Sequence, residues 1–262
     1  INNFDRSFIN LSGFKKLNGS QLLKENIIYI LNSLKSKVDQ IENKKTILHI
    51  FNSKYLLDKK KVENLPIGLF GNFYSHELTF LLIGNNDLKN IKQIFNKNKL
   101  EVKKIILKKF CEGVKLINQN NIETFYKIKI NHDTCNIIFF DQASFKYSEN
   151  FNFGTDIIFK DIKKICSIDN DLIINFFNNG FDKDKKFSDN QLLEEKYFSK
   201  GSYRKIRKNL IIDIVKARID EIINIILHKN INIQKFNKEK IKIYITFQDI
   251  TVSNNFYEYF ES

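Results

Sequence analysis

The amino-acid sequence predicts a mixed α/β protein. Short alternating or continuous apolar runs, typical of strands, are interleaved with longer stretches in which apolar residues recur every three or four positions, typical of helices. Elements of both kinds that alternate along a chain predict layers of helix and sheet around a shared core. The chain has 262 residues, 42% of them hydrophobic, which is enough to bury one or two such cores.

Six short runs have the composition and length of strands. They are Ser7–Leu11, Thr46–Phe51, His76–Ile83, Phe125–Ile130, Asn136–Phe140 and Ile241–Ile245.

Four stretches have helical spacing. The first begins near Ser20, a residue type that caps helices, and keeps its apolar spacing to Ile41. The second begins at Asp87, the third covers Phe153 to about Ile165, and the longest runs from about Tyr203 to His228.

Composition excludes several classes of protein. The three cysteines, Cys111, Cys135 and Cys166, are odd in number and widely spaced, so we expect neither a disulfide framework nor a zinc site, and a reducing cytoplasm fits. No uncharged apolar run approaches the ~18 residues of a membrane-spanning helix. The chain starts at Ile1 without an initiator methionine, and we expect it to be a piece of a longer protein.

The formal net charge of +13 raises the alternative of a basic nucleic-acid-binding protein. The lysines are spread over the whole chain, however, and the densest groups, Lys59–Lys61 and Arg204–Lys208, are short. Net charge alone predicts only non-specific affinity. We therefore expect no specific nucleic-acid partner.

Two neighbouring motifs carry a family resemblance. In Leu48–Asp58, a Leu-His pair is followed by Tyr55 and then by Asp58, and Pro66–Gly71 is a turn with one rigid proline and two permissive glycines. In this order and spacing they resemble the FtsA family, the actin-like proteins of bacterial cell division. The resemblance extends from about Leu11 to Ile165 and continues more weakly over Lys208–Asp249.

The resemblance implies an actin-like ATPase fold, built from ribonuclease H-like lobes, in which a small insert called 1C replaces the usual fourth subdomain. Residues 1–99 would form most of the 1C insert, and residues 100–126 would return to the first lobe. Residues 127–262 would form the second lobe, with a variable excursion near 178–201.

The family's phosphate-binding hairpin has the pattern Asp-Ile-Gly-Gly-Gly-Thr-x-Asp. Glycines let backbone N–H groups approach the phosphates, and the acidic residues organise Mg²⁺. The corresponding stretch, Lys129–Asn136, has Asn131, His132 and Asp133 in place of the glycines and keeps Thr134. Lys129 and Asn136 replace the two acidic residues. We expect a plain hairpin whose turn is Asn131–Thr134.

The adenosine side of the site is also altered. The family's Thr-Gly-Gly turn corresponds to Thr246-Phe247-Gln248, which lacks both glycines. Arg218 matches a characteristic arginine of the family, but Lys216 stands where the family has an acidic residue. We therefore expect a pseudo-ATPase, with no catalytic residue, no metal site and no bound ATP or Mg²⁺.

By resemblance, the predicted function is a non-catalytic division scaffold that links FtsZ filaments to the membrane and to other divisome proteins. It would self-associate and lie at the cytoplasmic face of the inner membrane at the division site. Membrane attachment would use a C-terminal tail that this chain does not contain. The alternative is a PilM-like adaptor of a type IV pilus or secretion system, which shares the architecture, keeps glycine-rich phosphate turns and binds a short peptide of an inner-membrane partner.

Overall fold

The computed structural model describes residues 4–179, 181, 188, 190–198, 202–234 and 241–260. The chain forms two compact units. Unit 1 comprises Ile1–Phe125 and Ile138–Tyr147, and unit 2 comprises Tyr126–Ile137 and Ser148–Ser262. The division into a 1C insert and two lobes stays a prediction.

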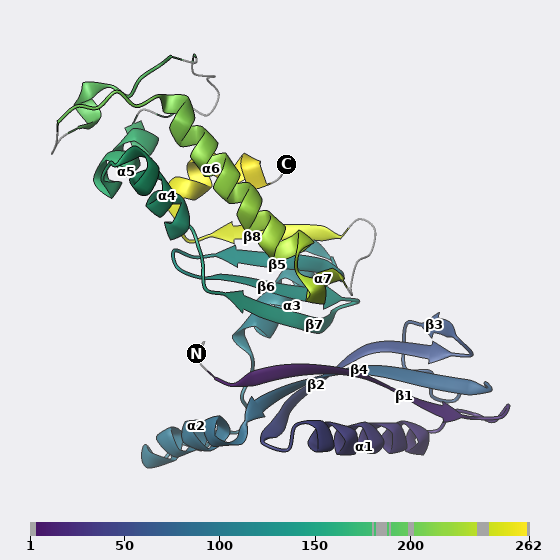
Figure 1. Ribbon diagram of the computed structural model, residues 1–262. Helices are drawn as coiled ribbons and strands as arrows, with labels where there is room; N and C mark the ends of the chain where they lie inside the picture. The colour runs from purple at the N-terminus through teal and green to yellow at the C-terminus, as the bar shows by residue number, and fades with distance from the viewer. Residues whose placement is uncertain are drawn as a thin grey trace. The chain divides into compact units, whose positions relative to one another are not determined.

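Unit 1 contains a four-stranded antiparallel sheet with the strand order β1-β4-β2-β3 (Figure 1). The strands are β1 (Arg6–Lys16), β2 (Lys45–Leu57), β3 (Lys60–Val62) and β4 (Phe73–Gly84). The alternation of side chains along β4 gives the sheet two different faces, because successive residues of a strand point to opposite sides.

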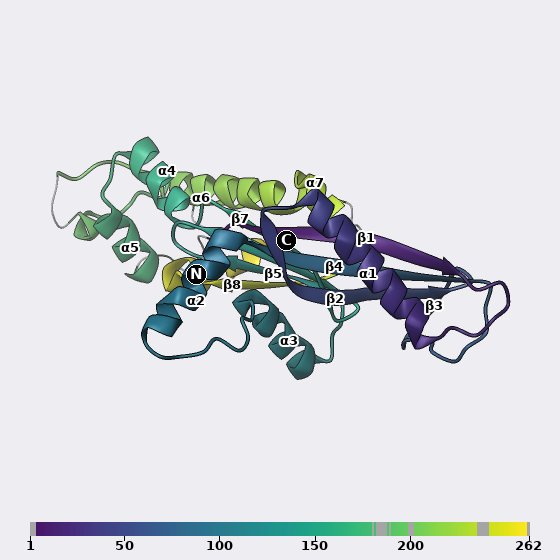
Figure 2. The same ribbon diagram turned by 90° about the horizontal axis from the view of Figure 1, so that it is seen from below.

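Helix α1 (Lys24–Ile41) lies along one face of this sheet (Figures 1 and 2). Its buried residues Ile30, Leu34 and Val38 pack against even-numbered residues of β4 such as Leu78 and Phe80. A Cβ atom on Gly13 of β1 would lie 2.4 Å from Ile30 Cγ2, so the glycine allows the helix to come close to the sheet. This contact forms the core of the unit.

The opposite face carries aromatic side chains and a buried polar network. Phe51 of β2 contacts Phe110 of α3 (Lys108–Asn120) with ring centroids 4.9 Å apart. The buried ammonium of Lys146 donates to Glu77 Oε1 at 2.9 Å and also contacts Ser53 Oγ. A buried charge needs such partners, and these side chains hold the register of the unit.

A second four-stranded sheet has the order β7-β6-β5-β8. Its strands are β5 (Phe125–Ile130), β6 (Cys135–Asp141), β7 (Ser144–Phe151) and β8 (Lys242–Phe247). The helical elements of unit 2 are α4 (Asp156–Cys166), α5 (Asn170–Asn179), η1 (Glu195–Tyr197), α6 (Lys208–Ile223), the π-helical turn η2 (Asn224–His228), α7 (Ile231–Gln234), α8 (Ile250–Phe256) and η3 (Tyr257–Phe260). Helix α6 packs on α4 and on η3.

The structure confirms the six predicted strands and extends most of them. It also confirms the second predicted helix, which is α2 (Asn85–Lys97). Ser20 is not the cap of α1, because its hydroxyl donates to Leu17 O. The first turn is closed instead by Asn26, whose Oδ1 accepts the N–H of Leu23 at 2.9 Å.

One further difference concerns a helix boundary. The long helix begins at Lys208 rather than at Tyr203. Much of the variable excursion near 178–201 lies outside the described residues. Among the described residues, none of the helices combines the length and hydropathy that a membrane crossing needs.

Candidate functional site

The predicted turn Asn131–Thr134 joins β5 to β6 in unit 2. The backbone N–H of Asn131 donates to Thr134 O at 2.8 Å, and Asn131 Nδ2 donates to Thr134 Oγ1 at 3.0 Å. Asn, Asp and Thr close tight turns by hydrogen bonds of this local kind, so the sequence folds here without help from a ligand.

The N-terminus of α4 lies directly against this turn. The N–H groups of Thr155 and Asp156 donate to the carbonyl oxygens of Asn131 and His132 at 3.0 and 2.8 Å. A Cβ atom on Gly154 would lie 2.2 Å from Asn131 O and 2.5 Å from His132 O. The glycine is therefore required by the contact between two backbone segments, and the first N–H groups of α4 are bonded inside the protein.

The segment between β8 and α8 is the third part of the chain that packs near this turn. The N–H of Gln248 donates to Ile130 O at 2.9 Å, and Thr246 Oγ1 donates to Ile128 O at 3.4 Å. Asp249 is buried and caps α8, because its Oδ1 accepts the N–H of Val252 at 3.1 Å. The predicted residue Thr246 therefore bonds to β5, the strand that leads into the turn Asn131–Thr134.

His132 lies close to carboxylates of the two other segments. Its Nδ1 lies 3.5 Å from Asp249 Oδ2 and 3.9 Å from Asp156 Oδ1. The hydroxyl of the buried Thr155 also donates to Asp249 Oδ2, at 3.4 Å. Sequence reasoning missed Asp249 and Thr155. Asp249 could have been identified from the sequence, because an Asp directly before the apolar start of a helix is a typical helix cap.

Comparison with solved structures decides the fold. A chain of the PilM–PilN type IV pilus biogenesis complex superposes with a TM-score of 0.54 over 98% of this chain and 63% of that chain, at 6% sequence identity. The protein has an actin-like ATPase fold. At this identity the likeness shows the actin-like fold alone, and the present chain spans less than two thirds of the PilM-type chain.

Two other structures align over smaller parts of the chain. The ethanolamine utilization protein EutJ of Carboxydothermus hydrogenoformans has a TM-score of 0.36 at 13% identity, over 57% of this chain and 46% of its own. Component A of the Acidaminococcus fermentans (R)-2-hydroxyglutaryl-CoA dehydratase has a TM-score of 0.32 at 12% identity, over 58% and 56%. Both scores are too low to add to the fold assignment. No protein-family model and no curated protein matches the sequence.

The family resemblance predicts that phosphates would bind at the hairpin between β5 and β6. Here the N–H groups of Asn131, Thr155 and Asp156 are all bonded to protein carbonyls. The carboxylates of Asp156 and Asp249 lie beside the turn, where they would repel an anion. The two carboxylates do not suit the phosphates of a nucleotide, because a phosphate site needs positive charge as well as N–H donors. Among the described residues, no group of three or more His, Cys, Asp or Glu side chains could hold a metal ion.

The structure does not bring Arg218 to the turn. Its guanidinium on α6 pairs with Asp161 of α4, through both Nε and Nη2, and with Glu221 one turn further along α6. The side chains of Arg218 and Asp161 are 28% and 26% exposed. In this chain, the arginine that matches the family joins two helices.

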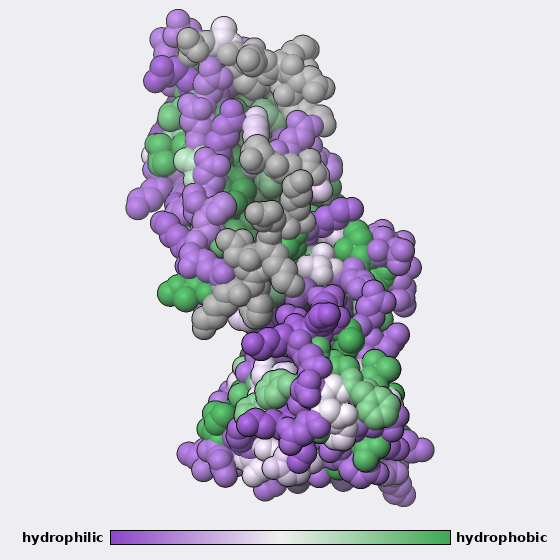
Figure 3. All heavy atoms as spheres, turned by 90° about the vertical axis from the view of Figure 1, so that its right-hand side faces the viewer, coloured by the Kyte–Doolittle hydropathy of each residue, from purple (hydrophilic) through white to green (hydrophobic). Residues whose placement is uncertain are grey.

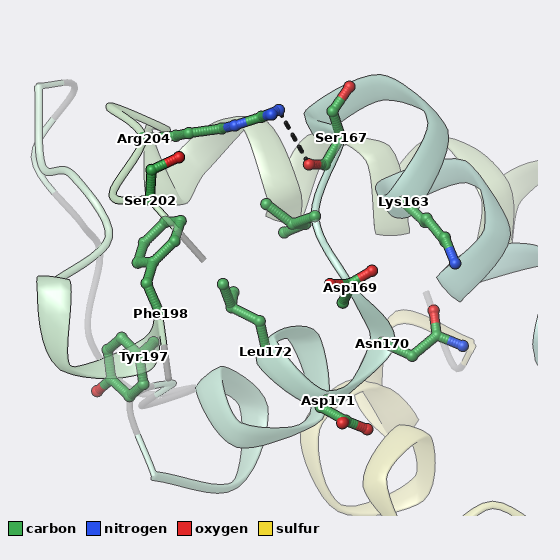
Figure 4. A pocket seen from close by; sticks show the side chains of 11 residues that line it. Lys163, Ser167, Asp169, Asn170, Asp171, Leu172, Tyr197, Phe198, Ser202 and Arg204 are labelled. Carbon is green, nitrogen blue, oxygen red and sulfur yellow. Dashed lines mark hydrogen bonds between the residues drawn. The ribbon is translucent and has the colours of Figure 1, made fainter. Parts of the chain in front are cut away.

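A separate polar pocket lies where α4 turns into α5 (Figure 4). Its volume is about 410 Å³, and its lining includes the apolar side chains of Leu172 and Phe198. The lining also has two cations, Lys163 and Arg204, and two carboxylates, Asp169 and Asp171. Arg204 Nη1 donates to Ser167 O at 3.0 Å. The pocket thus combines apolar contact with a fixed guanidinium, a combination that suits a short peptide segment.

Proposed function

We propose that this chain is a nucleotide-independent, actin-fold adaptor that binds a partner protein and catalyses no reaction. The residues of the turn Asn131–Thr134 and their neighbours carry this proposal. The turn has side chains at all three positions where the family resemblance expects glycine, and the carboxylates of Asp156 and Asp249 lie beside it. Both features disfavour the binding of Mg-ATP.

The first candidate is an adaptor of the PilM type. It is supported by the fold shared with a chain of the PilM–PilN complex over 98% of the present chain. In that case the partner would be a PilN-like protein of a type IV pilus or secretion system. The proteins share 6% of their residues, so the partner does not follow from sequence.

The second candidate is an FtsA-type division scaffold. It is favoured by the Leu-His, Tyr55 and Asp58 motif and by the turn Pro66–Gly71, both in unit 1. The partners would then be FtsZ filaments and other divisome proteins, at the cytoplasmic face of the membrane.

We place the partner segment in the pocket between α4 and α5. The guanidinium of Arg204 would pair with a carboxylate of the partner, while Leu172 and Phe198 would receive an apolar side chain. Arg207 is exposed and outside the pocket lining, so it offers a matched control for a charge reversal.

Binding measurements with two immobilised probes from the same organism test this function. The probes are a short PilN peptide and assembled FtsZ, and the whole chain is the analyte. We expect one probe to bind with the same affinity with and without Mg-ATP, and Arg204→Glu to weaken binding about tenfold, while Arg207→Glu does not. Binding that requires ATP, or no binding to either probe, would contradict the proposal.

A further inference from the structure

One end of unit 1 exposes apolar side chains on a loop. In residues 65–70, which connect β3 to β4, Ile67, Leu69 and Phe70 are 49%, 51% and 71% exposed. Isolated exposed apolar residues are common, but three within four positions of one loop are a surface feature that needs an account.

Backbone hydrogen bonds hold this loop beside two other segments. Leu22 N donates to Leu69 O and Gly68 N donates to Leu22 O, both at 2.9 Å, which places the half-exposed Leu23 next to the loop. Asp58 Oδ1 accepts the N–H groups of Asn72 and Phe73 at 2.8 and 2.7 Å. The apolar residues therefore stand on a fixed backbone next to the turn between β2 and β3.

Lysines lie in the segments that adjoin the loop. Lys59 lies in the turn after Asp58, Lys60 and Lys61 begin β3, Lys16 ends β1 and Lys24 begins α1, and all five are exposed. Two carboxylates, those of Asp58 and Glu63, lie in the same part of the chain, and that of Asp58 accepts two backbone hydrogen bonds. We call this end of unit 1, formed by residues 14–24 and 58–72, the basic tip.

The charge of the chain is concentrated in the same part of the sequence. Residues 1–125 contain 21 Lys and Arg against 11 Asp and Glu, whereas residues 126–262 contain 22 against 19. An asymmetry of this kind is typical of a protein that approaches an anionic surface with one side.

We propose that the basic tip binds the surface of an anionic lipid bilayer. Ile67, Leu69 and Phe70 would enter the headgroup region while the lysines contact lipid phosphates. Modest apolar insertion and electrostatic attraction are each weak alone, and together they give reversible binding to a membrane surface. This contact is independent of the proposed adaptor function and of any C-terminal tail.

The distribution of the apolar side chains favours lipid over a protein partner. Figure 3, in which the right-hand end of Figure 1 faces the viewer, shows hydrophobic residues on this end of unit 1 separated by hydrophilic ones. The core of a protein interface is a continuous apolar patch that is depleted in lysine. A short loop with a few apolar side chains, flanked by segments that carry lysines, instead suits a fluid surface into which the loop can insert.

Co-sedimentation with vesicles tests the proposal. The whole chain is mixed with vesicles of phosphatidylcholine alone or of phosphatidylcholine and phosphatidylglycerol in equal amounts. We expect binding to the second kind only, with a loss at high salt. Leu69→Ser with Phe70→Ser, and Lys59→Glu with Lys60→Glu and Lys61→Glu, should each weaken binding on the order of tenfold or more.

Helix α2 provides matched controls in the same unit. Ile94 and Phe95 are 62% and 45% exposed, and Lys89, Lys92 and Lys97 are exposed as well. The same serine and glutamate substitutions there should leave vesicle binding within twofold. Equal losses of vesicle binding from the tip variants and the α2 variants would overturn the proposal. Binding to neutral vesicles that the tip substitutions leave unchanged would also overturn it. It would also be overturned if the tip variants abolished self-association in light scattering without changing vesicle binding, because the partner would then be a second copy.

Discussion

At the scale of single residues, the glycine required for backbone packing is present, whereas the glycines expected for ligand binding are replaced. The three positions at which the family resemblance expects glycine carry Asn131, His132 and Asp133, yet Gly154 is present. The contact of Gly154 with the carbonyl oxygens of the turn explains this difference. A glycine here serves backbone packing, whereas the absent ones would serve an anion.

Substitution of Gly154 by alanine tests this reading. The added Cβ would overlap two backbone oxygens that cannot move independently of the turn, so we expect a loss of about 2 kcal/mol or more in the free energy of unfolding. Urea unfolding of the whole chain measures it. Gly84→Ala is the control, because its nearest neighbour is the Asp87 side-chain oxygen at 3.3 Å and its φ is ordinary. Equal losses in both variants would contradict the account.

Sequence reasoning identified the turn but not its closure. The polar residues of Asn131–Thr134 predict a tight turn from local chemistry. The bonds from Thr155 and Asp156 to this turn, and from Gln248 to the preceding Ile130, come from residues distant in sequence, and neither spacing nor composition shows them. Arg218 illustrates the same limit, because its partner Asp161 belongs to another helix.

At the scale of elements, apolar spacing predicted strands and helices where it was long and regular. The 13-residue β2 was predicted only in part, because its two bulges interrupt the alternation. The short strand β3, with its lysines, has no apolar pattern at all. Helix α5 was not predicted from the sequence. It begins at Asn170, only a few residues after α4 ends at Cys166, so its apolar residues were not recognised as a second helix.

The pair formed by Arg218 and Asp161 should stabilise the packing of α6 on α4. A double-mutant cycle with Arg218→Ala and Asp161→Ala is expected to give a coupling energy of about 1 kcal/mol, because both side chains are partly buried. Lys160 and Asp156, which are exposed and 3.9 Å apart on α4, should couple by less than about 0.5 kcal/mol. A smaller coupling energy for Arg218 and Asp161 than for Lys160 and Asp156 would show that the Arg218 pair does not stabilise the packing.

The sheet of unit 1 should make stability depend on pH. Burial among Tyr55, Tyr74 and the α1 face lowers the pKa of His76 from its ordinary value of 6.5 to about 4. Between these values, the unfolded chain binds a proton that the folded chain does not. Stability therefore falls as the pH falls from 6.5 toward 4, by up to about 1.4 kcal/mol per pH unit.

His76→Gln isolates this contribution. Glutamine does not titrate and can still donate to Asn52 Oδ1, which His76 Nε2 contacts at 3.2 Å. Urea unfolding at pH 7 and pH 5 should show a smaller drop for the variant than for the original chain. Parallel drops would mean that the acid sensitivity comes from other groups.

At the scale of the whole molecule, the fold is retained while the residues of the expected nucleotide site differ from the family pattern. The backbone keeps an actin-like path over 98% of the chain. The hairpin that would hold phosphates is closed by its own side chains and by α4. We infer that the fold serves here as a scaffold for binding surfaces, with the α4–α5 pocket and the basic tip as the two that the structure favours.

An isothermal titration of the whole chain with Mg-ATP tests the central claim most directly. With side chains at the three expected glycine positions and two carboxylates beside the turn, the account predicts no binding heat up to millimolar nucleotide. Saturable, Mg²⁺-dependent binding in the micromolar range would contradict it, because the turn would then have to open for the phosphates.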